Sequence, residues 1–259
     1  MKDLLLVAEK ELREIVGAGG GRRGVVRELL FVGIFGLFFP LSQAAAWRMG
    51  AVPAIFVLLI PLFLVGPHVA DSFAGERERR TLETLLATRL PDAAIFLGKV
   101  LAVCAYAWSV TFLILVASLV TLNATGAGRP PSFPGLPAPD PGPFLYPGFV
   151  WAAWAAGSAA TSLLLGSIGT FVSLRAKTVR SAAQALTIPV FVVIFGASAG
   201  LPVAWRALPG PARARLVGIA ETMSPLEFVL GLAASLLVLD ALLLWVGVRR
   251  FRRDTLIAG

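Results

Sequence analysis

The sequence predicts an all-α polytopic membrane protein with six transmembrane helices, and three observations lead to this fold class. Of its 259 residues, 57% are hydrophobic and only 15% are charged, which leaves too little polar surface to cover a water-soluble globule. Apolar runs long enough to cross a bilayer recur along the chain. Lysine and arginine concentrate in alternate connections between those runs, as the orientation of membrane helices requires.

Six segments have the length and composition of spans, since roughly 20 apolar residues are needed to cross about 30 Å of hydrocarbon. They are residues 29–47, 49–70, 100–123, 148–174, 182–202 and 228–248. The first two follow each other so closely that we expect a tight external turn around Arg48. Only Asp240 interrupts the apolar run of the last span.

The basic residues predict the orientation of the spans. With the N-terminus inside, 18 lysines and arginines lie on the inner side and five on the outer side, which accounts for all 23. Cytoplasmic loops carry this excess, so both termini are expected in the cytoplasm and the chain in the cell membrane (inner or plasma membrane). The net charge of +8 is then explained by topology and contact with anionic lipid. No basic-aromatic module points to nucleic acid.

Residues 2–16 precede the first span and have the pattern of an amphipathic helix. Leu5, Ala8, Leu12 and Ile15 recur at helical spacing. The segment suits a helix lying in the inner headgroup layer, with an ordinary solvated helix as the alternative. The glycines that follow, in GAGGGRRG at 17–24, match G-x-G-x-x-G formally, but no strand precedes them, so we interpret them as a hinge.

The segment from 123 to 147 contains eight prolines and is expected to form an irregular external loop, because proline is excluded from helix interiors. It either only connects two spans or also docks an extracytoplasmic partner.

The segment 75–92 is the most highly charged connection, and its leucines have helical spacing. Leu82, Leu85, Leu86 and Leu90 follow a charged lead-in, and Pro91 should end the helix at Leu90. Because a helix of about ten residues is marginal alone in water, its leucine face needs a partner. That partner is the lipid surface, the inner helix ends of the same chain, or a separate cytoplasmic protein.

The order of residues in this segment resembles the signature of ABC-2 type transporter permeases. The matching groups are Glu76-Arg77-Glu78, Thr81-Leu82-Glu83, Leu85-Leu86, Pro91 and Gly98-Lys99. In that family the connection is the coupling helix between spans 2 and 3, and the N-terminal amphipathic helix is the elbow helix. Arg80 departs from the pattern, because the family often has a small residue there, usually glycine.

The resemblance implies a membrane permease subunit of an ATP-driven exporter that works with two ATP-binding subunits and a second permease chain, identical or homologous. No phosphate-binding loop occurs in the sequence, so ATP and Mg are expected on the partner, and neither a cofactor nor a metal on this chain. Docking to the ATPase would involve Glu76, Arg77, Glu78, Arg80, Thr81, Leu82, Glu83, Leu85, Leu86 and Pro91.

In this family spans 2 and 5 line the translocation pathway, and here both contain prolines, which kink helices. The pathway candidates are Phe56, Leu59, Pro61, Phe63, Pro189, Phe191 and Phe195. An apolar lining would favour a lipid-like or hydrophobic substrate.

Three ionisable residues lie in or beside predicted spans. Asp240 is interpreted as a structural hydrogen-bonding group or as a functional carboxylate. His68 is expected to form an interfacial pair with Asp71, and Lys99 to extend its ammonium to the cytoplasmic headgroups. The alternative function is an ion-coupled carrier or channel that uses Asp240 and His68.

Overall fold

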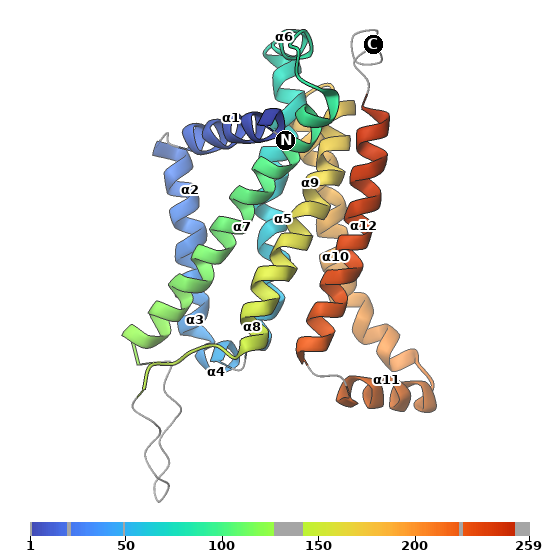
Figure 1. The fold of residues 1–259 in the computed structure, drawn as a ribbon. Coiled ribbons are helices and arrows are strands. Elements are labelled where there is room, and N and C mark those ends of the chain that lie inside the picture. Colours follow the sequence, from blue (N-terminus) through green and yellow to red (C-terminus); the bar gives the residue numbers. More distant parts are fainter. Residues whose placement is uncertain (1, 20–21, 49, 127–141, 223–224, 252–259) are drawn as a thin grey trace, which may run out of the picture.

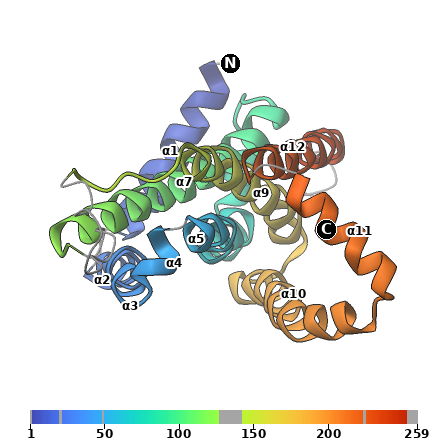
Figure 2. The same ribbon diagram turned by 90° about the horizontal axis from the view of Figure 1, so that it is seen from below.

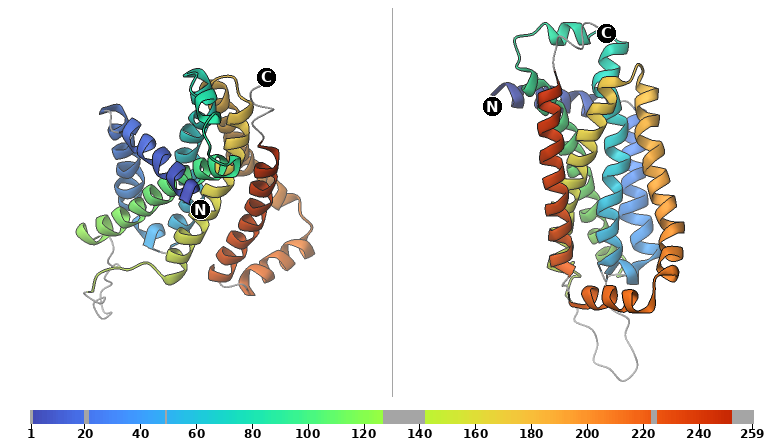
Figure 3. Two further views of the ribbon diagram at one scale, coloured as in Figure 1. Left: turned by 45° about the horizontal axis from the view of Figure 1, so that its top comes forward. Right: turned by 90° about the vertical axis from the view of Figure 1, so that its right-hand side faces the viewer.

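The computed structural model describes residues 2–19, 22–48, 50–126, 142–222 and 225–251, and within these ranges it is helical without strands. Five long helices run side by side (Figure 1): α5 (Ala51–Glu78), α7 (Asp92–Ala124), α9 (Ser158–Arg175), α10 (Val179–Ala207) and α12 (Pro225–Arg250). Helix α1 (Lys2–Gly19) lies across one end and α11 (Gly210–Thr222) across the other (Figure 3). We call the first the α6 end, because α6 (Leu82–Leu86) also lies there, and the second the α11 end.

Four helices in the described part of the chain are long and apolar enough to cross a membrane: Ile55–Glu78, Asp92–Ala124, Gly148–Arg175 and Leu230–Arg249. They coincide with predicted spans 2, 3, 4 and 6. The helix from Gly148 includes α8 (Gly148–Ala152), the π-helix η2 (Ala153–Gly157) and α9. Two shorter apolar helices, Glu28–Ser42 and Val179–Val192, occupy the places of spans 1 and 5. The count of six therefore stays a prediction.

The first predicted span, 29–47, is not one continuous helix. It consists of α2 (Arg22–Val32), the π-helix η1 (Gly33–Phe38), α3 (Phe39–Ser42) and α4 (Ala44–Arg48). Pro40 has no N–H to donate to the carbonyl of Gly36, and the hydroxyl of Thr121 in α7 lies within hydrogen-bonding distance of that carbonyl, at 3.0 Å, and of the carbonyl of Ala117, at 2.8 Å. The interruption is thus stabilised by a neighbouring helix.

The second span and the connection after it also differ from expectation. Helix α5 continues eight residues past the predicted end at residue 70, so Glu76, Arg77 and Glu78 belong to it. The prediction of a coupling helix that continues to Leu90 was wrong. Helix α6 ends at Leu86, and turns and bends follow. Thr88 donates both its N–H and its hydroxyl to the carbonyl of Leu85, which closes a turn, and Pro91 disfavours helix at the residue before it.

The core lies where α5, α7 and α9 meet. Small residues allow the close approach: a Cβ on Gly169 would lie 2.3 Å from a methyl carbon of Val69. Helix α10 packs on α5 and α9 but stands at the edge of the bundle when seen from below (Figure 2). Its apolar side chains, such as Val192 and Phe195, are more than 60% exposed, so this face needs lipid or another chain as a neighbour.

Candidate functional site at the α6 end

Helix α5 ends in a backbone motif that turns the chain toward α6. The N–H of Arg80 donates to the carbonyl of Arg77 at 3.1 Å, and the N–H of Thr81 donates to that of Glu76 at 2.9 Å. This pair of bonds is the Schellman motif, in which one residue adopts the left-handed conformation that glycine favours. Arg80 adopts it with φ of 58°, at the position where the resemblance led us to expect glycine.

The charged end of α5 is fastened to the connection between α9 and α10. The Arg77 guanidinium donates to the carbonyl oxygens of Leu174, at 2.8 Å, and Ala176. The Glu78 carboxylate accepts from the N–H of Val179 at 2.8 Å. A cation thus meets the C-terminus of α9 and an anion the N-terminus of α10, where the helix dipoles favour them.

One turn earlier, a buried serine of α9 joins the same two helices. The hydroxyl of Ser173 accepts from the N–H groups of Phe73 and Ala74, at 3.1 and 3.0 Å, and donates to the carbonyl of Ala70 at 2.9 Å. A polar contact shielded from water is harder to break than an exposed one. We therefore expect the ends of α5 and α9 to move as one unit.

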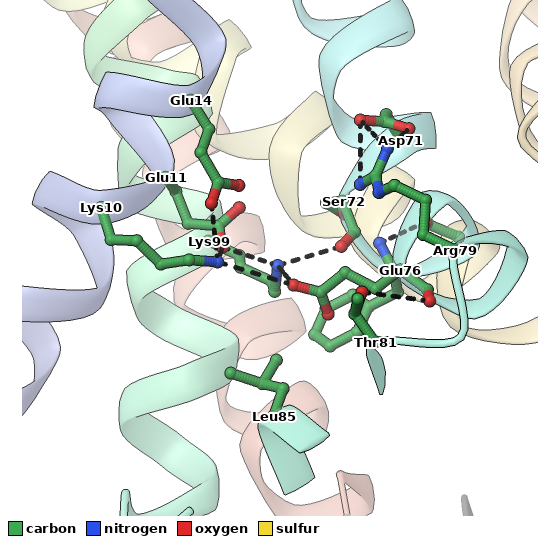
Figure 4. Close-up of polar contacts among 12 residues, drawn as sticks. Lys10, Glu11, Glu14, Asp71, Ser72, Glu76, Arg79, Thr81, Leu85 and Lys99 are labelled. Atoms are coloured by element: carbon green, nitrogen blue, oxygen red, sulfur yellow. Dashed lines mark hydrogen bonds and ion pairs between the residues drawn. The ribbon is translucent and has the colours of Figure 1, made fainter. Parts of the chain in front are cut away.

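Lys99 of α7 lies at the centre of a buried charge cluster (Figure 4). Its ammonium donates to Glu11 of α1 at 2.8 Å, to Glu76 of α5 at 2.9 Å and to the carbonyl of Ser72 at 3.0 Å. The Lys99 side chain is only 1% exposed. The expectation that it extends to the headgroups was therefore wrong, because two carboxylates and a carbonyl satisfy all three of its donors inside the protein.

A second lysine shares both carboxylates of this cluster. The Lys10 ammonium lies 3.2 Å from the Glu11 oxygen and 3.9 Å from the Glu76 oxygen that Lys99 also contacts, and 3.1 Å from Glu14. Partial burial alone lowers the pKa of Lys10, but Glu11 and Glu14 outweigh it, so this pKa lies above its ordinary value. Lys10 is thus a charged neighbour of the buried cluster.

An open cavity of about 780 Å³ lies beside the cluster. Four helices contribute to its walls: Lys10, Glu11 and Glu14 lie on α1, Asp71, Ser72 and Glu76 on α5, Thr84 and Leu85 on α6, and Val103 on α7. The second oxygen of Glu76 is buried and accepts no hydrogen bond from the described residues. The α6 end therefore combines charged groups with free volume.

Helix α6 turns Leu82 and Leu85 toward its own chain. Leu82 is buried against Phe73, Ile95 and Phe96, and Leu85 packs at the edge of this group. Thr81, Glu83 and Thr84 are exposed, as are Arg80 and Pro91, whereas the side chain of Leu86 lies outside the described part. Of the ten predicted docking residues, Glu76 and Leu82 are thus buried within the chain.

His68 and Asp71 lie one helical turn apart on α5, beside the cavity. The Asp71 carboxylate pairs with Arg79 at 3.1 Å, and the His68 ring meets the Tyr106 ring edge to face, with centroids 4.7 Å apart. No group of three His, Cys, Asp or Glu side chains suited to a metal ion occurs in the described ranges.

The structure divides the pathway candidates between two places. Phe63 meets Phe191 with ring centroids 6.3 Å apart, and Phe191 stacks on Phe195. Phe63 and Phe191 border a cavity of about 190 Å³ between α5 and α10. Phe56 instead packs among Phe35, Phe39 and Trp47. The remaining candidates range from half-buried Leu59 and buried Pro61 to exposed Pro189.

Asp240 of α12 is 2% exposed, and neither carboxylate oxygen accepts a hydrogen bond from the described residues. The described residues thus supply no partner for a structural hydrogen bond to Asp240, and both interpretations of this carboxylate stay predictions. The predicted external loop of residues 123–147 falls largely on residues 127–141, which lie outside the described part of the chain.

Sequence reasoning missed Glu11, which supplies one of the two carboxylates around Lys99. A signal was present: Glu11 lies three residues after Ala8 and four before Ile15, so it interrupts the apolar face of the helix. An acidic residue on that face indicates a buried cationic partner.

Comparison with known families agrees with the resemblance seen in the signature. A family model described as "ABC-2 family transporter protein" matches residues 42–214, which is more than half of the chain. The match includes the end of α5, all of α6 and Lys99. No curated protein matches the chain.

Proposed function

Because the chain belongs to the ABC-2 transporter family, we propose that it is the permease subunit of an ATP-driven exporter whose ATPase is a separate chain. The family match across the α6 end is the observation that carries this proposal. The sequence has no phosphate-binding loop, which favours ATP and Mg on that partner. The complete exporter would contain two ATP-binding subunits and two permease chains.

The proposed topology has six spans, with both termini in the cytoplasm. Segments α2 to α4 form the first span and α10 the fifth, while α1 is the elbow helix and α6 the coupling helix. Apolar α10 supports the fifth span, and its prolines, Pro189 and Pro202, are compatible with a membrane helix. The excess of Lys and Arg supports placing the α6 end on the cytoplasmic side.

The proposed ATPase docking surface is the exposed face of α6 and Ala87, the residue that follows it. Glu83, Thr84 and Ala87 are exposed there, whereas Leu82 packs inward. The leucines would hold α6 on the bundle, and the polar face would meet the partner.

A matched pair of substitutions tests this surface. Ala87→Arg places a bulky charge on the docking face, and Ala124→Arg makes the same change at an exposed position on the far end of α7. Affinity purification of the tagged chain from its native membrane should recover the ATPase with Ala124→Arg, and much less of it with Ala87→Arg. A normal yield with Ala87→Arg would remove the docking assignment, and a loss confined to Ala124→Arg would invert the topology.

The pathway proposal places the substrate between α5 and α10, beside Phe63, Phe191 and Phe195. These aromatic rings present an apolar surface, which suits a lipid-like or hydrophobic substrate. Export assays with panels of fluorescent lipids and hydrophobic drugs test the substrate class, and transport restricted to polar solutes would contradict it.

The buried carboxylate of Asp240, which has no hydrogen-bond donor among the described residues, favours a second candidate function. An ion-coupled carrier or channel would use such a group together with His68. Reconstitution separates the two functions: the purified chain alone should transport nothing if it is a permease subunit, whereas an ion gradient alone should drive a carrier.

A further inference from the structure

We propose that Lys99 is a positioning residue for energy coupling, which transmits movement of the coupling helix α6 to the elbow helix α1. This inference rests on the proposed function, because the ATPase would supply the movement. The Glu11–Lys99–Glu76 cluster, named here the joint, would be the physical connection.

A series of contacts runs from the coupling helix through α5 and α7 to the elbow helix. Thr81, at the start of the coupling helix, donates its N–H to the carbonyl of Glu76 and its hydroxyl to the same oxygen, at 2.9 and 3.3 Å. The Glu76 carboxylate accepts from Lys99, which also donates to Glu11. Glu11 belongs to the elbow helix. The path from α6 to α1 is thus continuous.

Burial makes this connection stiff. The side chains of Lys99, Glu76 and Glu11 are 1%, 7% and 9% exposed, so separating them would leave charges with neither water nor a partner. When Glu76 is displaced, it must either carry Lys99 and Glu11 with it or reach another cation. A contact that transmits movement from one helix to another has to resist separation in this way.

Lys10 is a second cation beside the joint, so Glu76 has two cationic partners within reach. Its ammonium already lies 3.9 Å from the Glu76 oxygen and 3.2 Å from the Glu11 oxygen. The second Glu76 oxygen has no hydrogen-bond partner among the described residues, and the adjacent cavity of about 780 Å³ leaves room for a shift. Glu76 can therefore turn from Lys99 toward Lys10, which also belongs to the elbow helix, so either pairing keeps Glu76 neutralised and tied to α1.

Spin-label distances in the exporter complex test the joint. Labels at Arg13→Cys in the elbow helix and at Arg89→Cys after the coupling helix are each paired with one at Ser235→Cys on α12. All three positions are exposed. Native Cys104 is replaced, Cys104→Ala. With the ATPase bound, ATP plus orthovanadate should shift both distances in the chain with an intact joint.

The decisive variant is the neutral triple Lys99→Met, Glu11→Gln and Glu76→Gln, which removes the joint without leaving a bare buried charge and is expected to fold. In it the Arg89 distance should still shift and the Arg13 distance should not. The exposed Lys2→Met serves as control and should behave like the parent. An equal Arg13 shift in the triple variant, or no shift of either distance in the parent complex, would overturn the joint.

A measurement on the isolated chain separates this inference from the proposed function. With labels at Arg13→Cys and Arg89→Cys together, the distance distribution should be narrow in the parent and broad in the neutral triple variant. Identical distributions would refute the joint whether or not an ATPase is found. Failure to recover any ATPase with the parent chain would instead refute the proposed function.

Discussion

The backbone conformation of Arg80 sets the direction of the chain between α5 and α6. It is the only residue other than glycine with positive φ in the described ranges, and it permits the reversal between α5 and α6. Glycine adopts this conformation without steric strain, whereas a residue with a Cβ is penalised by about 1 to 2 kcal/mol. The arginine therefore adds charge to the α6 end at the expense of backbone strain.

We expect Arg80→Gly to stabilise the chain by about 1 kcal/mol, reduced somewhat by the greater freedom of glycine in the unfolded chain. The readout is the apparent melting temperature in detergent. Arg80→Ala is the matched control, because it removes the same charge but keeps a Cβ. If the alanine variant is as stable as the glycine variant, backbone strain at this position is not the cause.

Helix α1 is held against α7 by close packing as well as by charge. A Cβ on Gly98 would lie 2.7 Å from the Cβ and a methyl carbon of Val7, so only glycine permits the observed distance between α1 and α7. Gly98 precedes Lys99 and thus positions the joint. Packing and charge converge on the same contact between the two helices.

Gly98→Ala is expected to push α1 outward and to destabilise the chain by about 1 to 3 kcal/mol, as overpacking does. Thermal unfolding in detergent measures the change. Gly231→Ala, at an exposed position of α12 with open space around it, is the control and should be neutral or slightly stabilising, because alanine favours helix. Equal effects of both substitutions would show that helix propensity alone is responsible.

At the scale of the whole molecule, the arrangement of helices decides which connections share one side of the membrane. The α6 end carries α1, α6 and the connection between α9 and α10, and the α11 end carries α11 and the end of α7 (Figures 1 and 3). Arg77 and Glu78, which precede the connection between α5 and α7, form hydrogen bonds to the connection between α9 and α10. These two connections must therefore face the same compartment.

We expect a membrane-impermeant maleimide applied to intact cells to modify Asn123→Cys and Arg215→Cys, and to leave Arg89→Cys and Lys177→Cys unmodified. All four positions are exposed, and Cys104→Ala provides the background. The physical reason is the positive-inside distribution of Lys and Arg. Permeabilised cells give the control, in which all four should react. Modification of both Lys177→Cys and Arg215→Cys from outside would exclude α10 as a spanning helix.

Composition and periodicity were sufficient for the helical class and for the four long apolar helices, and resemblance to a family supplied the signature around α6, because all of these properties are local along the chain. The same local rules misplaced the ends of several elements. They broke off the second span at residue 70, although α5 continues to Glu78, and they extended the coupling helix to Leu90, although it ends at Leu86. Contacts with α9 and α10 hold the end of α5, and the turn closed by Thr88 ends α6.

The sequence by itself determined that this protein is a helical membrane chain with an amphipathic helix and a charged, leucine-bearing connection, since hydrophobicity and charge spacing are written in residue order. Only the tertiary structure decided that Lys99 is buried between Glu11 and Glu76, residues that lie 88 and 23 positions away from it. It also decided that Leu82 faces inward. Pairing across such separations depends on which helices pack together, and that is a property of the folded bundle.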